Sequence, residues 1–183
     1  MATNGIRLIT PTSVDKTGAS STATINAGGS VTFGLCETLS LNGVFSSAYD
    51  NYIIDIRHVG STNGVGLRIR LRASGTDNTT ANSYVFQYVD ANSTTVSGAR
   101  TTTTYATING VDDSQRGGTS LYLYGPNLAQ PTAGRSVTVD GFSNAYLIDA
   151  AFTHNQSTAY DGCTLFPSSG TFSGLVKVYG LVQ

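Results

Sequence analysis

The residues best suited to acid–base or nucleophilic chemistry are two histidines and one cysteine. His58 and His154 could each activate a serine, and Cys163 could pair with His154 as a nucleophile. No nucleophile elbow or other local catalytic signature surrounds any of them. We expect His58 at a solvated strand position, on the face opposite Ile54 and Ile56, and His154 in a polar loop. We therefore predict that the protein is not an enzyme.

Oxygen ligands for a metal ion are concentrated in the segment NGVDDSQ, residues 109–115. Asn109, Asp112 and Asp113 could donate oxygens to calcium, but the twelve-residue loop that ends in a bidentate glutamate is missing. A solvated acidic loop explains the segment better. We therefore expect no metal ion and no other cofactor.

The most specific polar pattern is an arginine ladder in the segment VGLRIRLRA. Arg68, Arg70 and Arg72 alternate with apolar residues, so a strand here would have one apolar face and one cationic face. The ladder could be a solvated face with cross-strand partners such as Asp55, or a contact surface for a neighbouring subunit or an acidic glycan. We favour the solvated face. Nucleic acid is not expected as a partner, because no supporting basic residues accompany the ladder.

Tyrosines are the remaining candidates for binding, since the chain has ten of them and no tryptophan. Tyr122 and Tyr124 share one face of the alternating segment LYLYG. Tyrosine rings near Asn, Asp and Gln suit a carbohydrate site, but tyrosines are also at home in subunit interfaces and in ordinary sandwiches. The sequence leaves these three roles open.

The elements that position these residues are predicted to be strands. Charged residues are only 11% of the 183 residues, whereas the 21 glycines and many Ser, Thr and Asn residues favour turns and strands over helices. Alternating apolar segments, separated by turn residues, indicate roughly ten strands. We expect a single all-β domain, a jelly-roll-like antiparallel sandwich over residues 22–183, preceded by an extended N-terminal arm over residues 1–21.

Several local features of this sandwich can also be predicted. Residues 53–58 and 65–73 are expected to be hairpin partners, and residues 91–98 a turn. No segment has a convincing helical pattern, and residues 143–152 are the best helical candidate. The tripeptide Ala-Tyr-Asp occurs at residues 48–50 and again at 159–161, each time before an apolar stretch. We interpret both copies as turns that lead into strands of the two sheets.

Charge and cysteine content limit the classes of function. The net charge of -1 provides no field that would recruit nucleic acid or an anionic membrane, and near-neutrality favours a chain that lives in an assembly. The sequence has no membrane-spanning stretch and no export signal, so we expect synthesis in a cytosol and no membrane insertion. Cys36 and Cys163 are expected to be small buried residues without a disulfide.

Four blocks of sequence resemble small β-rich virion proteins of tailed bacteriophages, a group labelled tail fibre, minor tail or structural proteins. The blocks are LNGVFSSAYDNYIIDIRHVGST, LRIRLRASGTDNTTANSYVFQYV, LYLYGPNLAQPT and THNQSTAYDGCTLFPSSGTFSGLVKVYG. The resemblance extends from about residue 22 to the C-terminus. It implies a sandwich displayed on the virion, commonly as a symmetric oligomer, with motifs that form the fold and carry no catalysis.

This resemblance leads to ranked expectations for function. The preferred role is a tail fibre or tail-tip component, a homotrimer or larger ring that exposes the loops 76–82 and 109–118 to the host surface and its polysaccharide. The arm over residues 1–21 would attach it to other virion proteins. The second role is a capsid decoration (cement) or head-fibre protein on the outer capsid surface. The third is a glycan-binding or glycan-degrading tail protein.

Overall fold

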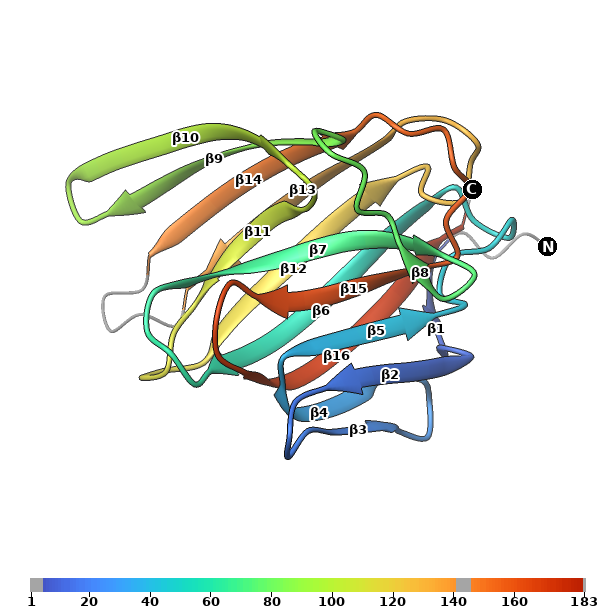
Figure 1. Cartoon of the computed structure of the whole chain (residues 1–183), viewed down its shortest axis with the longest axis horizontal. Helices are drawn as coiled ribbons and strands as arrows, with labels where there is room; N and C mark the ends of the chain where they lie inside the picture. Colours follow the sequence, from blue (N-terminus) through green and yellow to red (C-terminus); the bar gives the residue numbers. More distant parts are fainter. Residues whose placement is uncertain (1–4, 141–145, 183) are drawn as a thin grey trace.

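The structure is a computed structural model that describes residues 5–140 and 146–182. In these residues the chain forms sixteen strands and no helix. The strands make two antiparallel sheets that lie face to face, with the core between them (Figure 1). The prediction of an all-β, jelly-roll-like antiparallel sandwich is confirmed. The described residues include no helix whose length and hydropathy would let it span a bilayer.

The large sheet has ten strands in the order β10-β9-β14-β13-β12-β6-β16-β4-β3, and β1 pairs with β16. Its strands are β1 (Ile6–Ile9), β3 (Thr22–Ile25), β4 (Val31–Cys36), β6 (Asn51–Gly60), β9 (Tyr84–Asn92), β10 (Thr95–Thr103), β12 (Gly117–Tyr124), β13 (Thr132–Val139), β14 (Leu147–His154) and β16 (Phe172–Leu181).

The small sheet has six strands in the order β11-β7-β15-β5-β2, and β8 pairs with β7. Its strands are β2 (Ser13–Thr17), β5 (Thr38–Asn42), β7 (Val65–Ala73), β8 (Thr76–Asp77), β11 (Ala106–Val111) and β15 (Gly162–Pro167). The predicted alternation in β7 is confirmed, because Leu67, Ile69 and Leu71 are completely buried against the large sheet.

The expected hairpin between residues 53–58 and 65–73 is wrong. β6 pairs with β12 and β16, whereas β7 pairs with β11 and β15, so the two strands lie in opposite sheets. Each strand has one strongly apolar face, and packing these faces against one another across the core buries both. The turn residues between the strands therefore lead from one sheet to the other.

The N-terminal segment is extended, as expected, but it is not a separate arm. β1 pairs with β16 at the edge of one sheet, and β2 pairs with β5 at the edge of the other. The boundary at residue 22 is therefore wrong, since the sandwich already includes residues 6–17. The sequence pattern was misleading because β2 is an edge strand whose side chains are mostly exposed, so it lacks an apolar alternation.

Two further local predictions are corrected. Of the predicted turn over residues 91–98, residues 91–92 end strand β9 and residues 95–98 begin strand β10, so the hairpin turn is confined to Ser93 and Thr94. The helical candidate over residues 143–152 is strand β14 from Leu147 onward, and residues 143–145 lie outside the described residues. Tertiary pairing with β9 and β13 fixes this segment as a strand.

The repeated Ala-Tyr-Asp turns behave as predicted. The first copy ends one residue before β6 in the large sheet, and the second ends one residue before β15 in the small sheet. The segment after β12 joins them, because the Gly125 amide donates to the Asp50 carbonyl and the Tyr160 amide donates to the Pro126 carbonyl. The repeat is therefore a structural device that starts one strand in each layer at the same end of the sandwich.

Candidate functional site

His58 lies in the core and not on a solvated face. It shares its face of β6 with Ile54 and Ile56, because these residues are separated by two positions. The Asn109 amide donates to His58 Nε2 at 2.6 Å, and Thr119 Oγ1 lies 3.3 Å from the same nitrogen. Burial lowers the pKa of His58 to about 4. The side chain therefore belongs to a neutral buried network.

His154 is also buried, and its predicted loop is in fact the end of β14. Its Nε2 lies 2.5 Å from the Tyr160 hydroxyl, and its ring stacks on Tyr84 with 4.0 Å between centroids. Burial lowers the pKa of His154 to about 4 and raises the pKa of Cys163 to about 12. No hydrogen bond joins Cys163 to His154 in the described part of the chain, and a protonated thiol is a weak nucleophile.

The segment NGVDDSQ is not a solvated loop as a whole. Asn109 and Asp112 are buried, and the Asp112 carboxylate accepts a hydrogen bond of 2.8 Å from the Ser114 amide, as in an Asx turn. Of the three candidate metal ligands, only Asp113 has the expected exposure. Across residues 5–140 and 146–182, no three His, Cys, Asp or Glu side chains are grouped closely enough to hold a metal ion.

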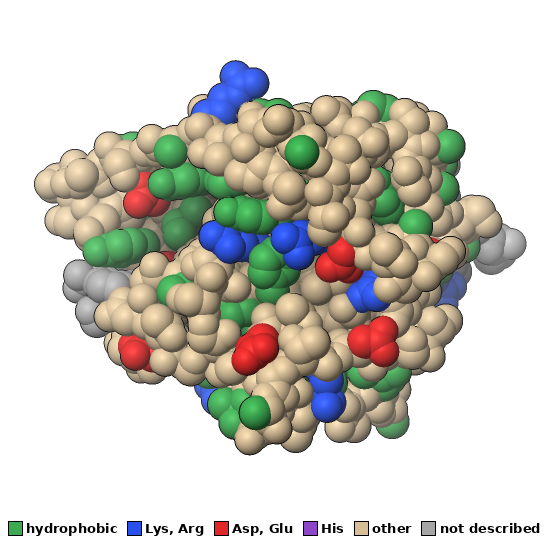
Figure 2. All heavy atoms as spheres, viewed as in Figure 1, with side chains coloured by type: hydrophobic (Ala, Val, Ile, Leu, Met, Phe, Trp, Pro, Cys, Tyr) green, Lys and Arg blue, Asp and Glu red, His purple; other side chains and the backbone are tan. Residues whose placement is uncertain are grey.

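The arginine ladder lies on the outer face of the small sheet, beside hydrophobic and acidic side chains (Figure 2). The guanidinium of Arg68 lies 4.1 Å from the centre of the Tyr105 ring, and that of Arg70 lies 4.6 Å from the centre of the Phe166 ring. Neither contacts Asp55, which is on the other sheet opposite Lys177. Arg68 and Arg70 are half-buried cations that pack on aromatic rings.

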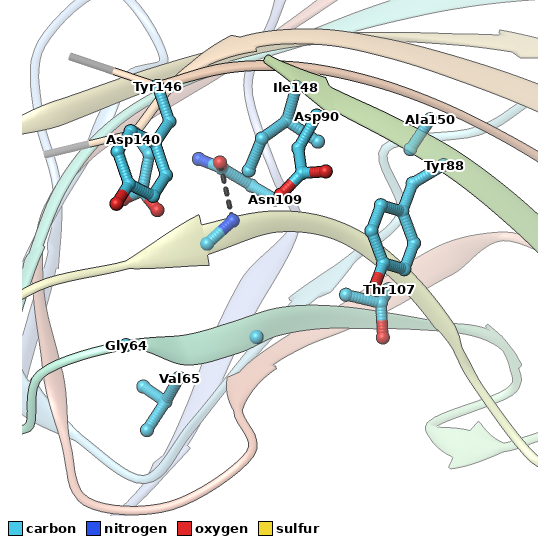
Figure 3. Close-up of a pocket in the computed structure, with 12 residues that line it drawn as sticks. Gly64, Val65, Tyr88, Asp90, Thr107, Asn109, Asp140, Tyr146, Ile148 and Ala150 are labelled. Atoms are coloured by element: carbon cyan, nitrogen blue, oxygen red, sulfur yellow. Dashed lines mark hydrogen bonds between the residues drawn. The ribbon is translucent and has the colours of Figure 1, made fainter. Parts of the chain in front are cut away.

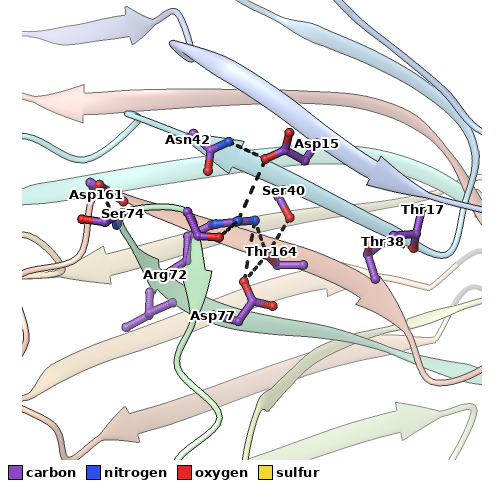
Figure 4. A network of polar contacts seen from close by, with 12 residues as sticks. Asp15, Thr17, Thr38, Ser40, Asn42, Arg72, Ser74, Asp77, Asp161 and Thr164 are labelled. Carbon is purple, nitrogen blue, oxygen red and sulfur yellow. Dashed lines mark hydrogen bonds and ion pairs between the residues drawn. The ribbon is translucent and has the colours of Figure 1, made fainter.

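Arg72 differs from the rest of the ladder because it is buried in a polar network (Figure 4). Its guanidinium donates to Thr164 Oγ1 at 3.0 Å and lies 3.7 Å from Asp77 and 4.0 Å from Asp15. Asp15 belongs to β2, so the N-terminal segment helps to neutralise this arginine. The solvated-face interpretation is therefore wrong for Arg72, because its side chain is buried and its guanidinium is bonded within the protein.

Tyr122 and Tyr124 project from the outer face of the large sheet, where they are 38% and 47% exposed. The strand register places four side chains in one row across β12, β6, β16 and β1: Tyr122, Ile53, Tyr179 and Leu8. Of ten exposed large hydrophobic side chains among the described residues, only Leu35 lies apart from this face. We call the other nine the outer apolar face: Ile6, Leu8, Val89, Val96, Tyr122, Tyr124, Val137, Val139 and Leu147.

A pocket of about 290 Å³ opens where the large sheet extends past the edge strand β11 of the small sheet (Figure 3). β9 and β14 form one wall, and β11 with the start of β7 forms the other. We call this the edge pocket; it is lined by Gly64, Val65, Gly66, Tyr88, Asp90, Thr107, Asn109, Gly110, Asp140, Tyr146, Ile148 and Ala150. A bulge in β11 between Thr107 and Asn109 gives this wall its irregular shape.

The polar side chains of the edge pocket are held by neighbours behind them. Asp90 accepts a hydrogen bond from Ser97 on β10. The Asn92 amide donates to the Tyr146 hydroxyl at 2.7 Å. Gly110 lies close to Asp140, and a Cβ at position 110 would force the Asp140 carboxylate to move. No sequence motif indicates this pocket, because its residues come from five separate segments.

Comparisons with known proteins give only distant similarities. The sequence matches no protein-family model and no curated protein. The C-terminal CBM6 of LamC from Zobellia galactanivorans is 11% identical over 95% of this chain and 98% of its own, with a TM-score of 0.34. The SPRY domain of human HERC1 is 9% identical over 92% of this chain and 99% of its own, with a TM-score of 0.32. Similarity at this level carries no argument about function.

Proposed function

We propose that this chain is a non-enzymatic structural protein of a tailed-bacteriophage virion, and that its copies assemble through the outer apolar face. Two things support the proposal: the four sequence blocks that resemble phage virion proteins, and the distribution of exposed hydrophobic side chains. The distribution of exposed hydrophobic side chains is the stronger support. Exposed hydrophobic side chains that gather on one side of a globular protein indicate an interaction site, and here nine of them lie on one face of one sheet.

The occupant that we propose for the outer apolar face is a second copy of this chain. The face carries charges of both signs: Arg135 bonds Asp149 at 3.0 Å, and Asp55 lies opposite Lys177 in the strand register. A surface with both signs can pair with a rotated copy of itself, as closed oligomers require. Each exposed Val or Tyr that becomes buried there contributes on the order of 1 kcal/mol.

Within the virion, the preferred role is a tail fibre or tail-tip component. Within the predicted loops 76–82 and 109–118, only residues 79–82 and 113–116 are both exposed and outside strands, and these are the parts now proposed to face the host. A capsid decoration or head-fibre protein is the alternative, and the same interface would serve a cluster of copies on the capsid. Residues 6–17 are no longer proposed as a tether, because β1 and β2 are paired within the sandwich.

The assembly proposal can be tested with a double variant, Tyr122→Ser with Val137→Ser. Both side chains are exposed in the single chain, so the thermal unfolding temperature of the monomer should change little. Sedimentation equilibrium should show an oligomer for the natural sequence and at least tenfold weaker association for the variant. Leu35→Asn is the matched control, because Leu35 is also exposed and Asn tolerates its positive φ of 50°.

Two results would contradict the proposal. A monomeric natural chain at the highest soluble concentration would remove the second copy as occupant, and equal association of the double variant would move the interface elsewhere. Location on the particle needs a separate measurement. Immunogold labelling of purified virions should place the chain on the tail for the preferred role and on the head for the alternative.

A further inference from the structure

The edge pocket is separate from the outer apolar face and needs its own explanation. It lies on the core side of β9 and β14, whereas the outer apolar face is on the opposite side of the same strands. Its volume of about 290 Å³ is at the lower end of the range for small-ligand pockets. Such a pocket fits one compact ring and its substituents.

The lining combines flat apolar surface with hydrogen-bond acceptors. Tyr88 and Tyr146 stand at opposite ends of the pocket, with Asp90 and Asn109 between them (Figure 3). A pyranose ring has the matching surface, because its C–H face packs on aromatic and aliphatic side chains while its hydroxyls donate to carboxylates. Hydrogen bonds from a hydroxyl to an ionised carboxylate are among the stronger ones in proteins.

The charge of the lining restricts the ligand further. Asp90 and Asp140 both line the pocket, and no Lys, Arg or His side chain is among its lining residues. A uronic or sialic acid would bring a third carboxylate to two others without a cation to offset it. The pocket therefore favours an uncharged sugar over an acidic one.

The supporting contacts indicate a binding site that is already formed. Asn109, at the base of the pocket, is fixed by His58 and Thr119 in the core, and its carbonyl accepts a hydrogen bond of 2.6 Å from the Gly110 amide. Asp90 and Tyr146 have partners on β10 and β9, as described above. Side chains that are held before binding lose little conformational entropy when a ligand enters.

We propose that the edge pocket binds one uncharged sugar residue of a surface polysaccharide, with Tyr88 and Tyr146 against the ring and Asp90 and Asp140 accepting from its hydroxyls. This inference does not depend on the assembly proposal, because a single chain contains the whole pocket. Binding by one small pocket should be weak, with a Kd of about 1 mM. An oligomer would strengthen the attachment to a repeating polysaccharide by multivalency.

The first experiment uses the full chain and nuclear magnetic resonance. Three glycines, Gly64, Gly66 and Gly110, line the pocket, so their amide signals report on its occupancy. We would titrate neutral methyl glycosides of the common hexoses and of N-acetylglucosamine, and glucuronic acid as the acidic counterpart. At least one neutral sugar should shift these three signals, while Gly28 and Gly43, in turns outside the pocket, stay unchanged. Glucuronic acid should leave all five signals unchanged.

The second experiment uses variants of the pocket and matched controls outside it. Asp90→Asn and Tyr88→Leu should each weaken the binding of the active sugar about tenfold, which is about 1.4 kcal/mol. Asp55→Asn and Tyr124→Leu make the same changes on the outer face of the large sheet and should leave the affinity unchanged. Thermal unfolding of each variant separates a loss of binding from a loss of fold.

Four outcomes would overturn the inference. The pocket glycines could fail to respond to every neutral sugar, or glucuronic acid could bind as well as the neutral sugars. Tetramethylammonium could bind more tightly than any sugar, which would make the pocket a site for a cation between aromatic rings and carboxylates. Finally, release of reducing ends from an oligosaccharide of the active sugar would make the two carboxylates catalytic.

Discussion

The two buried histidines make a quantitative prediction about stability in mild acid. His58 and His154 are both completely buried, and burial lowers the pKa of each to about 4. Their hydrogen-bond partners are neutral: Asn109 and Thr119 for His58, and Tyr160 for His154. Neither histidine therefore has a nearby carboxylate in these networks that would stabilise the charged form.

The sign and size of the effect follow from proton linkage. Each histidine has a pKa of about 6.5 in the unfolded chain and about 4 in the folded chain, so the unfolded state binds more protons between these values. Stability is therefore complete above about pH 6.5 and is lost as the pH falls toward 4. Between about pH 7.5 and pH 5, each histidine lowers the free energy of unfolding by about 2 kcal/mol. Both together remove about 4 kcal/mol, a large part of the 5 to 15 kcal/mol typical of a domain.

Urea unfolding at the two pH values, followed by tyrosine fluorescence, measures this difference directly. His58→Gln and His154→Gln should each lose about half of the pH dependence, because glutamine cannot be protonated. Carboxylates contribute little to the difference in stability between pH 7.5 and pH 5. Asp149, for example, has its pKa lowered by Arg135 and keeps its charge at pH 5. The reasoning would be refuted if the natural chain were equally stable at both pH values, or if both variants kept the full pH dependence.

Three other predictions concern the buried groups around these networks. Tyr160→Phe should lower the free energy of unfolding by about 1 to 3 kcal/mol in urea unfolding, because it leaves Asn78 without its 2.9 Å acceptor. Arg72→Gln should cost about 3 kcal/mol, whereas Arg70→Gln should cost about 1 kcal/mol or less, since only Arg72 is buried beside an aspartate. Cys163 should resist iodoacetamide until the chain unfolds, as mass spectrometry can show, because burial raises its pKa to about 12.

Much of the sandwich could be predicted because alternation depends on local geometry. The odd residues of β7 between 67 and 71 are apolar and buried, and the Ala-Tyr-Asp turns begin strands in both layers. The alternation of apolar residues in a strand does not show which other strands pair with it. β6 and β7 are consecutive in sequence, yet they face one another across the core, because each needs a cover for its apolar face.

The wrong predictions have different causes. His58 shares the parity of Ile54 and Ile56, so a correct count along β6 would have placed it in the core. The strands β2 and β10 are edge strands with exposed side chains, and their pairing rests on backbone hydrogen bonds that composition does not reveal. The edge pocket could not be predicted from the sequence for another reason. Tyr88, Asp90 and Asp140 are brought together only by the order of strands in the large sheet and by its extension past β11.

The two proposals give the two sides of the large sheet different functions: assembly on the outer side and ligand binding on the core side. Residues of β9 alternate between them: Val89 belongs to the outer apolar face, and Tyr88 and Asp90 belong to the edge pocket. A shift of one residue in the β9–β14 register would exchange these side chains and destroy both sites at once. Assembly on one side would leave the pocket on the other side open. The same register that buries the core therefore allows this chain to be held by its copies while its pocket faces a ligand.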